Sequence, residues 1–507
     1  MTVPVPKPAS NPPLPAPISL LTEVLVIIGV TCVLLVPCIW QQHIEAGDLA
    51  SHVYNAWLVA QVKTGVVQGL YLTHPLTNVL CDRILEWLLV RVGPAWAERM
   101  LAGTGVLVFF WGAFYLVNVV TLRRPWLLAP AFAMLAYGLV FNLGFVNFYV
   151  STGISLWITG LLWQPTRNRV ILSLPLWVLA ILAHVMPVAW AAFVLVYTHL
   201  LRRFTLKMRA GALAASFIAL IGMQLLVMKL FAYQWSLDQS LSLAGVLGVT
   251  GAEQVFLSGT KYFIVVAGAM AIGCVMFLER IDQGGMLNDP MVHIWILQMA
   301  AYVLTPAAVQ LPQYQHVFAY IPQRVSLFNA LIFCVMIGGG RYGRGITRLT
   351  ALLAGVYFTF FFLDSRSFND IESQVKALID SAPQGARVVA EIADSNSRLN
   401  PLLHIADRSC IGRCFSYANY EPATGQFRLR AAGPNLVVAP TMDVVKEIED
   451  GRHIVTKAEA PVYSVCKSDR AMLLRRLEAG ETTCSFSLPV SPAFWLSSGD
   501  QSQVPDH

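Results

Sequence analysis

The sequence predicts a polytopic α-helical membrane protein with a soluble α/β or α+β domain at its C-terminus. Of its 507 residues, 56% are hydrophobic and 13% are charged, whereas soluble domains carry about 25% charged residues. The mean hydropathy is +0.59, and long apolar runs recur between residues 18 and 363. From residue 364 the composition changes to that of a soluble domain.

Residues 1–17 are rich in proline and lack the charged start of a signal peptide, so we expect a disordered tail before the first anchor. A span needs about 20 apolar residues. The apolar runs predict eleven spans, at 18–40, 101–121, 126–144, 148–163, 170–184, 187–201, 211–231, 260–279, 292–311, 321–340 and 346–363. The shorter runs within 126–163 and 170–201 are expected to be hairpins in a bundle that encloses a cavity.

Basic residues predict the orientation of these spans, because short cytoplasmic loops are rich in Lys and Arg. The clusters are Arg123 and Arg124, Arg167 and Arg169, Arg202 to Arg209, and Arg341 to Arg348. With these loops inside, the N-terminus is cytoplasmic and residues 41–98 and 364–507 lie outside. The stretches 47–57 and 144–149 resemble those of uncharacterised bacterial polytopic membrane proteins, which implies an integral protein of a bacterial inner membrane. The net charge of +6 reflects these loops, which argues against a nucleic-acid partner.

The first outer loop, 41–98, is expected to carry two amphipathic helices, 49–64 and 76–92, lying on the membrane surface. In the C-terminal domain, strands are expected at 386–392, 435–439 and 454–465, and helices at 371–381, 442–450 and 468–479. Its cysteines are Cys410, Cys414, Cys466 and Cys484. Outside the cytosol these can form disulfides in any of three pairings, and zinc binding is the alternative.

The main candidate site begins at Asp48, immediately after the first span. Asp48, His52 and Asn55 have the spacing i, i+4 and i+7, which places them on one helix face at the membrane boundary. A carboxylate there must be solvated, paired or functional, because isolated burial in hydrocarbon is costly. The simpler alternative is that Asp48 only caps the helix that begins at Leu49.

Two further sites place polar groups at the same boundary. His184 precedes a Met-Pro break between two short spans, and the connection from Gln310 through His316 leads to Arg324 at the start of a later span. Arg324 suits a phosphate, because its planar fork donates two parallel hydrogen bonds. The alternatives are that Arg324 reaches lipid headgroups and that His184 is an interfacial packing residue.

A carboxylate and a cation over an enclosed cavity suggest group transfer: the first accepts a proton from a hydroxyl nucleophile and the second stabilises a departing phosphate. Outside the cytosol there is no nucleotide pool, so the phosphate would be carried by a lipid.

This arrangement resembles the C-type (GT-C) membrane glycosyltransferases, across residues 18–363 and at Asp48 followed by His52. The resemblance implies a polyprenyl-phosphate sugar donor, an acceptor outside the membrane and Asp48 as general base, with His52 beside it. Asn55, His184, His316 and Arg324 would then contact substrate. Many members carry two adjacent acids, whereas here Glu45 precedes Asp48 by three residues and Leu49 follows it. No cofactor follows from the sequence, and a divalent metal stays open.

Two other functions compete with this reading. A transporter or lipid flippase would also have broken helices, but would show repeated halves and ionisable residues in mid-span. A non-catalytic protein of envelope assembly would use the outer domain to bind a partner.

Overall fold

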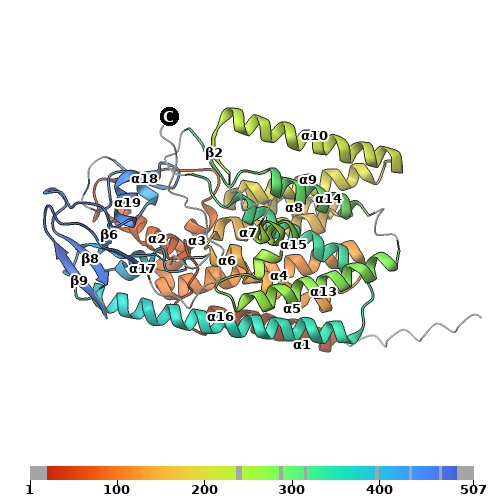
Figure 1. Cartoon of the computed structure of the whole chain (residues 1–507), viewed down its shortest axis with the longest axis horizontal. Coiled ribbons are helices and arrows are strands. Elements are labelled where there is room, and N and C mark those ends of the chain that lie inside the picture. Colours follow the sequence, from red (N-terminus) through yellow and green to blue (C-terminus); the bar gives the residue numbers. More distant parts are fainter. Residues whose placement is uncertain are drawn as a thin grey trace, which may run out of the picture.

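The computed structural model describes residues 20–235, 242–284, 289–312, 317–393, 399–432, 435, 437–467 and 471–487. The described chain is mostly helical, and its long helices run roughly along the longest axis of the molecule (Figure 1). The predicted tail at 1–17 lies outside these residues.

Six helices are long and apolar enough to cross a membrane. They are α1 with the short η1 (Leu20–Leu35 and Val36–Cys38), α4 (Pro94–Thr121), α10 (Leu206–Leu230), α13 (Tyr262–Asp282), α15 (Ile321–Gly338) and α16 (Arg344–Ile379). This finding supports the predicted class of membrane protein.

The other predicted spans coincide with shorter apolar helices. These are η2, α5 and α6 (Trp126–Leu128, Ala129–Ala136 and Leu139–Asn142), α7 (Val146–Leu162), α8 (Arg167–Ala183), α9 (Val185–Leu201) and α14 (Pro290–Leu304). The predicted span 126–144 is thus three consecutive pieces rather than one helix. The predicted span 292–311 ends early, because β3 (Ala308–Gln310) pairs with β2 (Ala232–Gln234).

Two of the basic clusters, at Arg123–Arg124 and at Arg341, lie together at one end of the bundle. Arg124 pairs with Glu23 at 2.7 Å, and Arg123 donates to the Gly340 carbonyl at 3.3 Å. The backbone N–H of Arg341 donates to Gln283. These contacts join four loops or helix ends that are far apart in sequence, in agreement with the single basic side that the charge pattern predicts.

The opposite end carries the C-terminal region, residues 380–487, together with residues 41–93 (Figure 1). Its main sheet has the order β6-β4-β8-β9, in which β4 is parallel to both neighbours and β8 is antiparallel to β9. The strands are β4 (Arg387–Val389), β6 (Phe415–Ser416), β8 (Val462–Lys467) and β9 (Met472–Leu477). Two smaller pairs join β5 (Glu391–Ala393) to β10 (Ser485–Ser487), and β1 (Leu70–Leu72) to β7 (Leu429–Ala431).

Helices of this end connect the sheet to the bundle. They are α2 (Leu49–Lys63), α3 (Leu80–Val92), α17 (Ile405–Cys410), α18 (Glu421–Thr424) and α19 (Met442–Glu449), while α12 (Leu243–Thr250) and η3 (Ala252–Val255) precede α13. Tyr54 and Leu58 of α2 share one apolar cluster with Val388 and Val465 of the sheet. The C-terminal region therefore builds part of its core from the loop that follows the first anchor.

Four local predictions were wrong. Helix α2 is buried over almost its whole first three turns, so it is an internal helix and not a surface one. Residues 346–379 form one continuous helix, α16, instead of a span and a separate helix. The described residues of 435–439 form no strand, and 472–477 is strand β9 because it pairs along its whole length with β8. The helices at 49–63 and 442–449 occur as predicted.

The cysteines of the C-terminal region pair as Cys410–Cys414 and Cys466–Cys484. Both bonds occupy the sulfur atoms that a zinc site would need as thiolates. They fit the predicted oxidising compartment.

Candidate functional site

Two glycine turns, one at Gly47 and one at Gly144, pack against each other and hold the backbone of Asp48 against the bundle. The Asp48 N–H donates to the Leu143 carbonyl at 3.2 Å. Gly144 has φ +77°, and a Cβ there would lie 2.3–2.6 Å from Ala46 O, Asp48 N and Leu49 N. Only glycine allows this conformation and this close approach. The turn between α6 and α7 therefore fixes where Asp48 sits.

The Asp48 carboxylate does not cap α2. Its backbone is already helical, with φ −62° and ψ −12°, and its side chain makes no capping hydrogen bond. Instead Oδ1 lies 3.3 Å from Nε2 of His404, and 23% of the Asp48 side chain remains exposed. The capping interpretation is therefore wrong, and the carboxylate has an imidazole partner from the other end of the chain.

His404 is a buried residue at the start of α17. Its Nδ1 lies 3.6 Å from Oδ2 of Asp407, and its ring stacks on Tyr420 with centroids 5.1 Å apart. Burial alone lowers the pKa of His404, but Asp48, Asp407 and Glu391 together raise it to about 9. At neutral pH a cation therefore stands beside the Asp48 carboxylate.

His52 and Asn55 have partners of their own. His52 Nδ1 lies 2.8 Å from Asp82 Oδ1, and Asn147 donates to Asp82 Oδ2 at 3.2 Å. Burial lowers the pKa of His52, but Asp82 and Glu421 raise it to about 9. Such a protonated, buried imidazole is poorly suited to accept a proton, so this geometry favours a structural role for His52.

Asn55 exchanges two hydrogen bonds with Asn419, at 3.2 and 2.7 Å. This reciprocal pair joins α2 to the C-terminal region. The shared helix face predicted for Asp48, His52 and Asn55 exists, but each of the three side chains contacts a different partner from elsewhere in the chain.

Arg324 lies in a box of aromatic rings. Its guanidinium carbon is 4.3, 4.4 and 5.5 Å from the ring centroids of Phe145, Phe318 and Phe148. One nitrogen donates to Ala319 O at 2.8 Å, and Nε has no hydrogen-bond partner among the described residues. Arg324 is 7% exposed, so it does not reach out to lipid headgroups as the simpler alternative required.

His184 shares two of these rings with Arg324. Its ring meets Phe148 edge-on at 5.4 Å and stacks on Phe318 at 6.0 Å. Its Nδ1 accepts the Met186 N–H at 3.1 Å, which caps α9. The structure thus brings His184 and Arg324 together beside the turn that holds Asp48. His316 lies outside the described residues.

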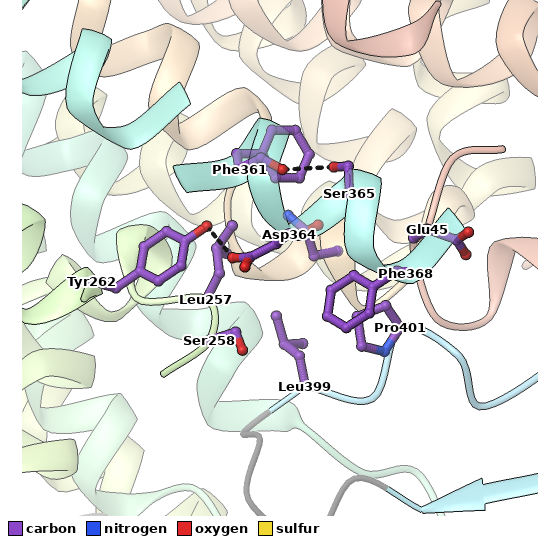
Figure 2. A pocket seen from close by; sticks show the side chains of 11 residues that line it. Glu45, Leu257, Ser258, Tyr262, Phe361, Asp364, Ser365, Phe368, Leu399 and Pro401 are labelled. Atoms are coloured by element: carbon purple, nitrogen blue, oxygen red, sulfur yellow. Dashed lines mark hydrogen bonds between the residues drawn. The ribbon is translucent and has the colours of Figure 1, made fainter. Parts of the chain in front are cut away.

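A small, partly open pocket lies at the same end of the bundle (Figure 2). Tyr262 donates to Asp364 at 2.9 Å on its wall, and Lys261 pairs with the same carboxylate. Glu45, Phe361, Phe368 and Pro401 also line it, among others. None of the five predicted site residues that the structure describes is on this wall.

A second polar cluster joins the loop, the bundle and the C-terminal region. Arg408 of α17 pairs with Glu45 at 2.9 Å, with Glu372 of α16 through Nε at 2.7 Å, and with Glu98 of α4. All four residues are at most 8% exposed. This cluster fixes α17, and with it His404, onto the bundle.

Sequence reasoning missed His404, Asp407 and Arg408. The available signal was the spacing His404-x-x-Asp407-Arg408 just before Cys410, three ionisable residues in a short, otherwise mainly apolar and small stretch. Among the described residues, no group of three or more His, Cys, Asp or Glu side chains has a geometry that could hold a metal ion.

Comparisons with protein-family models, with curated proteins and with solved structures found no match to this chain. The function is therefore inferred from the geometry of the residues.

Proposed function

We propose that this protein is a membrane glycosyltransferase of the C type, in which Asp48 is the general base. The observation that carries the proposal is the Asp48–His404 pair. It places a partly exposed carboxylate against a cation, on a backbone fixed by the turn at Gly144. The other acidic side chains near Asp48 are less suited to act as a base. Asp407 and Glu421 are buried, and both Asp82 oxygens accept hydrogen bonds.

The membrane arrangement in this proposal has eleven spans. Helices of 15–17 residues, such as α7, α8, α9 and α14, are about 22–26 Å long at 1.5 Å per residue. They cross most of a hydrocarbon core of about 30 Å when they lie inside a bundle. With the basic loops in the cytosol, the N-terminus is cytoplasmic, and Asp48 and both disulfides lie on the outer side.

The reaction follows from this placement. The oxygen of an acceptor hydroxyl attacks the anomeric carbon of the sugar, and the bond from that carbon to the phosphate oxygen breaks. The electron pair leaves with the polyprenyl phosphate, and Asp48 accepts the hydroxyl proton. We assign to Arg324 the stabilisation of the negative charge of the leaving phosphate, because its buried Nε has no hydrogen-bond partner among the described residues.

The test uses the purified protein in liposomes. Its substrates are radiolabelled undecaprenyl-phosphate esters of glucose, mannose and arabinose, with a bacterial envelope extract as acceptor. Asp48→Asn should reduce transfer by roughly 10²- to 10⁴-fold, the contribution of a positioned base. Asp370→Asn removes an exposed carboxylate of α16 at the same end and should leave transfer unchanged.

Two outcomes would contradict the proposal. Transfer by Asp48→Asn at the rate of the unchanged protein would remove the general base. Movement of the labelled lipid across the liposome membrane with its phosphate–sugar bond intact, and no transfer, would favour a flippase.

A further inference from the structure

We infer that His404 is a positioning residue of the transfer reaction, acting through Asp48, so that the C-terminal region supplies part of the active site. The inference deepens the proposed function and rests on it. His404 is 356 positions from Asp48 in the chain, and their side chains meet at 3.3 Å. Its other ring nitrogen faces Asp407 at 3.6 Å.

The surroundings of His404 are built to hold a cation. Asp48 faces it from the start of α2, Asp407 from its own helix α17, Glu391 from β5 and Glu449 from α19. The stack on Tyr420 fixes the plane of the ring. The Arg408 cluster holds α17 on the bundle, and the Cys410–Cys414 disulfide closes the turn that follows α17. An imidazole held in this way has one orientation and stays protonated at neutral pH.

A cation at this place has two effects on the proposed base. It keeps Asp48 ionised, because an adjacent positive charge favours the charged form of a carboxylate. It also holds one carboxylate oxygen, which limits the rotation of the side chain and orients the carboxylate toward the acceptor. The proton still goes from the acceptor to Asp48, and His404 does not touch the reacting atoms.

The first experiment is independent of transfer. Histidine labelled with ¹³C at Cε1 is incorporated into the full-length protein in nanodiscs, and the ten histidine signals are followed by NMR between pH 5 and 10. The His404 signal is the one missing from His404→Gln. It should titrate near pH 9 and should shift downward by about one pH unit or more in Asp48→Asn.

If His404→Gln does not accumulate, the signal is identified as the one that moves in both Asp48→Asn and Asp407→Asn. A His404 signal that titrates near pH 6.5 and ignores Asp48→Asn would overturn the inference, as would the absence of any signal sensitive to both substitutions.

The second experiment measures transfer against pH. His404→Gln retains a hydrogen-bond donor but carries no charge, so the acid limb of kcat should move up by about one pH unit while KM changes little. A purely structural role would lower the whole profile without moving that limb. If Asp48→Asn abolishes transfer but His404→Gln leaves the acid limb in place, the positioning role fails and the proposed function stands. If the His404 titration shifts in Asp48→Asn but the unchanged protein transfers nothing, the proposed function fails instead.

Discussion

Replacing Arg408 with leucine tests how the C-terminal region is held on the bundle. Arg408 is the cation that contacts Glu45, Glu98 and Glu372 in one buried cluster. Removing one partner of a buried ion pair costs about 3–5 kcal/mol, because the remaining charges lose their compensation. Unfolding entropy is about 2.1 cal/mol/K per residue, so over 507 residues this loss lowers the apparent midpoint by about 3–5 °C.

The midpoint can be measured with a thiol-reactive dye, since Cys38, Cys81 and Cys334 are free and buried and react only when the protein opens. Arg475→Leu is the control, because Arg475 is an arginine of β9 with a half-exposed ion pair to Glu481. Exposed pairs contribute about 0–1 kcal/mol, so its midpoint should hardly move. Equal midpoints for the two variants would refute the role given to the cluster.

The loss of stability caused by Arg408→Leu should also grow as pH rises. Burial, followed by the charge of Glu372, raises the pKa of Glu45 well above its usual value even with Arg408 present. A carboxyl with a raised folded-state pKa contributes stability below its unfolded pKa and loses it as pH rises. Arg408→Leu should therefore differ less from the unchanged protein at pH 5 than at pH 8. In the Arg408→Leu background, replacing Glu45, Glu98 and Glu372 with glutamine should raise the unfolding midpoint at pH 8 part of the way back to that of the unchanged protein.

Three other predictions follow from the site and the disulfides. Gly144→Ala places a methyl group within 2.6 Å of the backbone that carries Asp48, so it should reduce both the transfer rate and the stability of the protein. Gly211→Ala is the control: its methyl group meets nothing within 4 Å, and it should leave both quantities unchanged. Arg324→Lys keeps the charge but loses the planar fork, and should lower kcat by tenfold or more with equal expression. Cys466→Ala with Cys484→Ala opens an 18-residue loop and should lower stability by about 2–4 kcal/mol, measured as denaturant midpoint; an unchanged midpoint would contradict the pairing.

The membrane part could be predicted because hydropathy acts locally. Each expected span coincides with helical segments of the structure, and two of the basic loops meet at one end of the bundle. The break of the span 126–144 was not visible, since apolar residues continue on both sides of Gly138, where α5 ends and α6 begins. The continuity of α16 was hidden by Asp364, which looks like the end of a span but pairs with Lys261.

Of the Asp48–His404 pair, only Asp48 could be predicted from the sequence. Asp48 stood out because a carboxylate after an anchor is costly unless it is used, but its partner is 356 positions away and no local pattern joins them. The same holds for Asn55 with Asn419, and for Leu70 with Ala431 in the β1–β7 pair. Strand β9 was expected to be helical because Leu, Met and Arg favour helices, and pairing with β8 overrides that preference.

The sidedness of Asp48 and the C-terminal region is decisive for the proposed function, because a lipid-borne donor is required only outside the cytosol. Single cysteines are introduced at the exposed positions Asp443, Val66 and Arg341 and labelled in intact spheroplasts with a membrane-impermeant maleimide. We expect Asp443→Cys and Val66→Cys to be labelled, and Arg341→Cys to be labelled only after lysis. Labelling of Arg341→Cys alone in intact spheroplasts, or of only one of the other two, would contradict it.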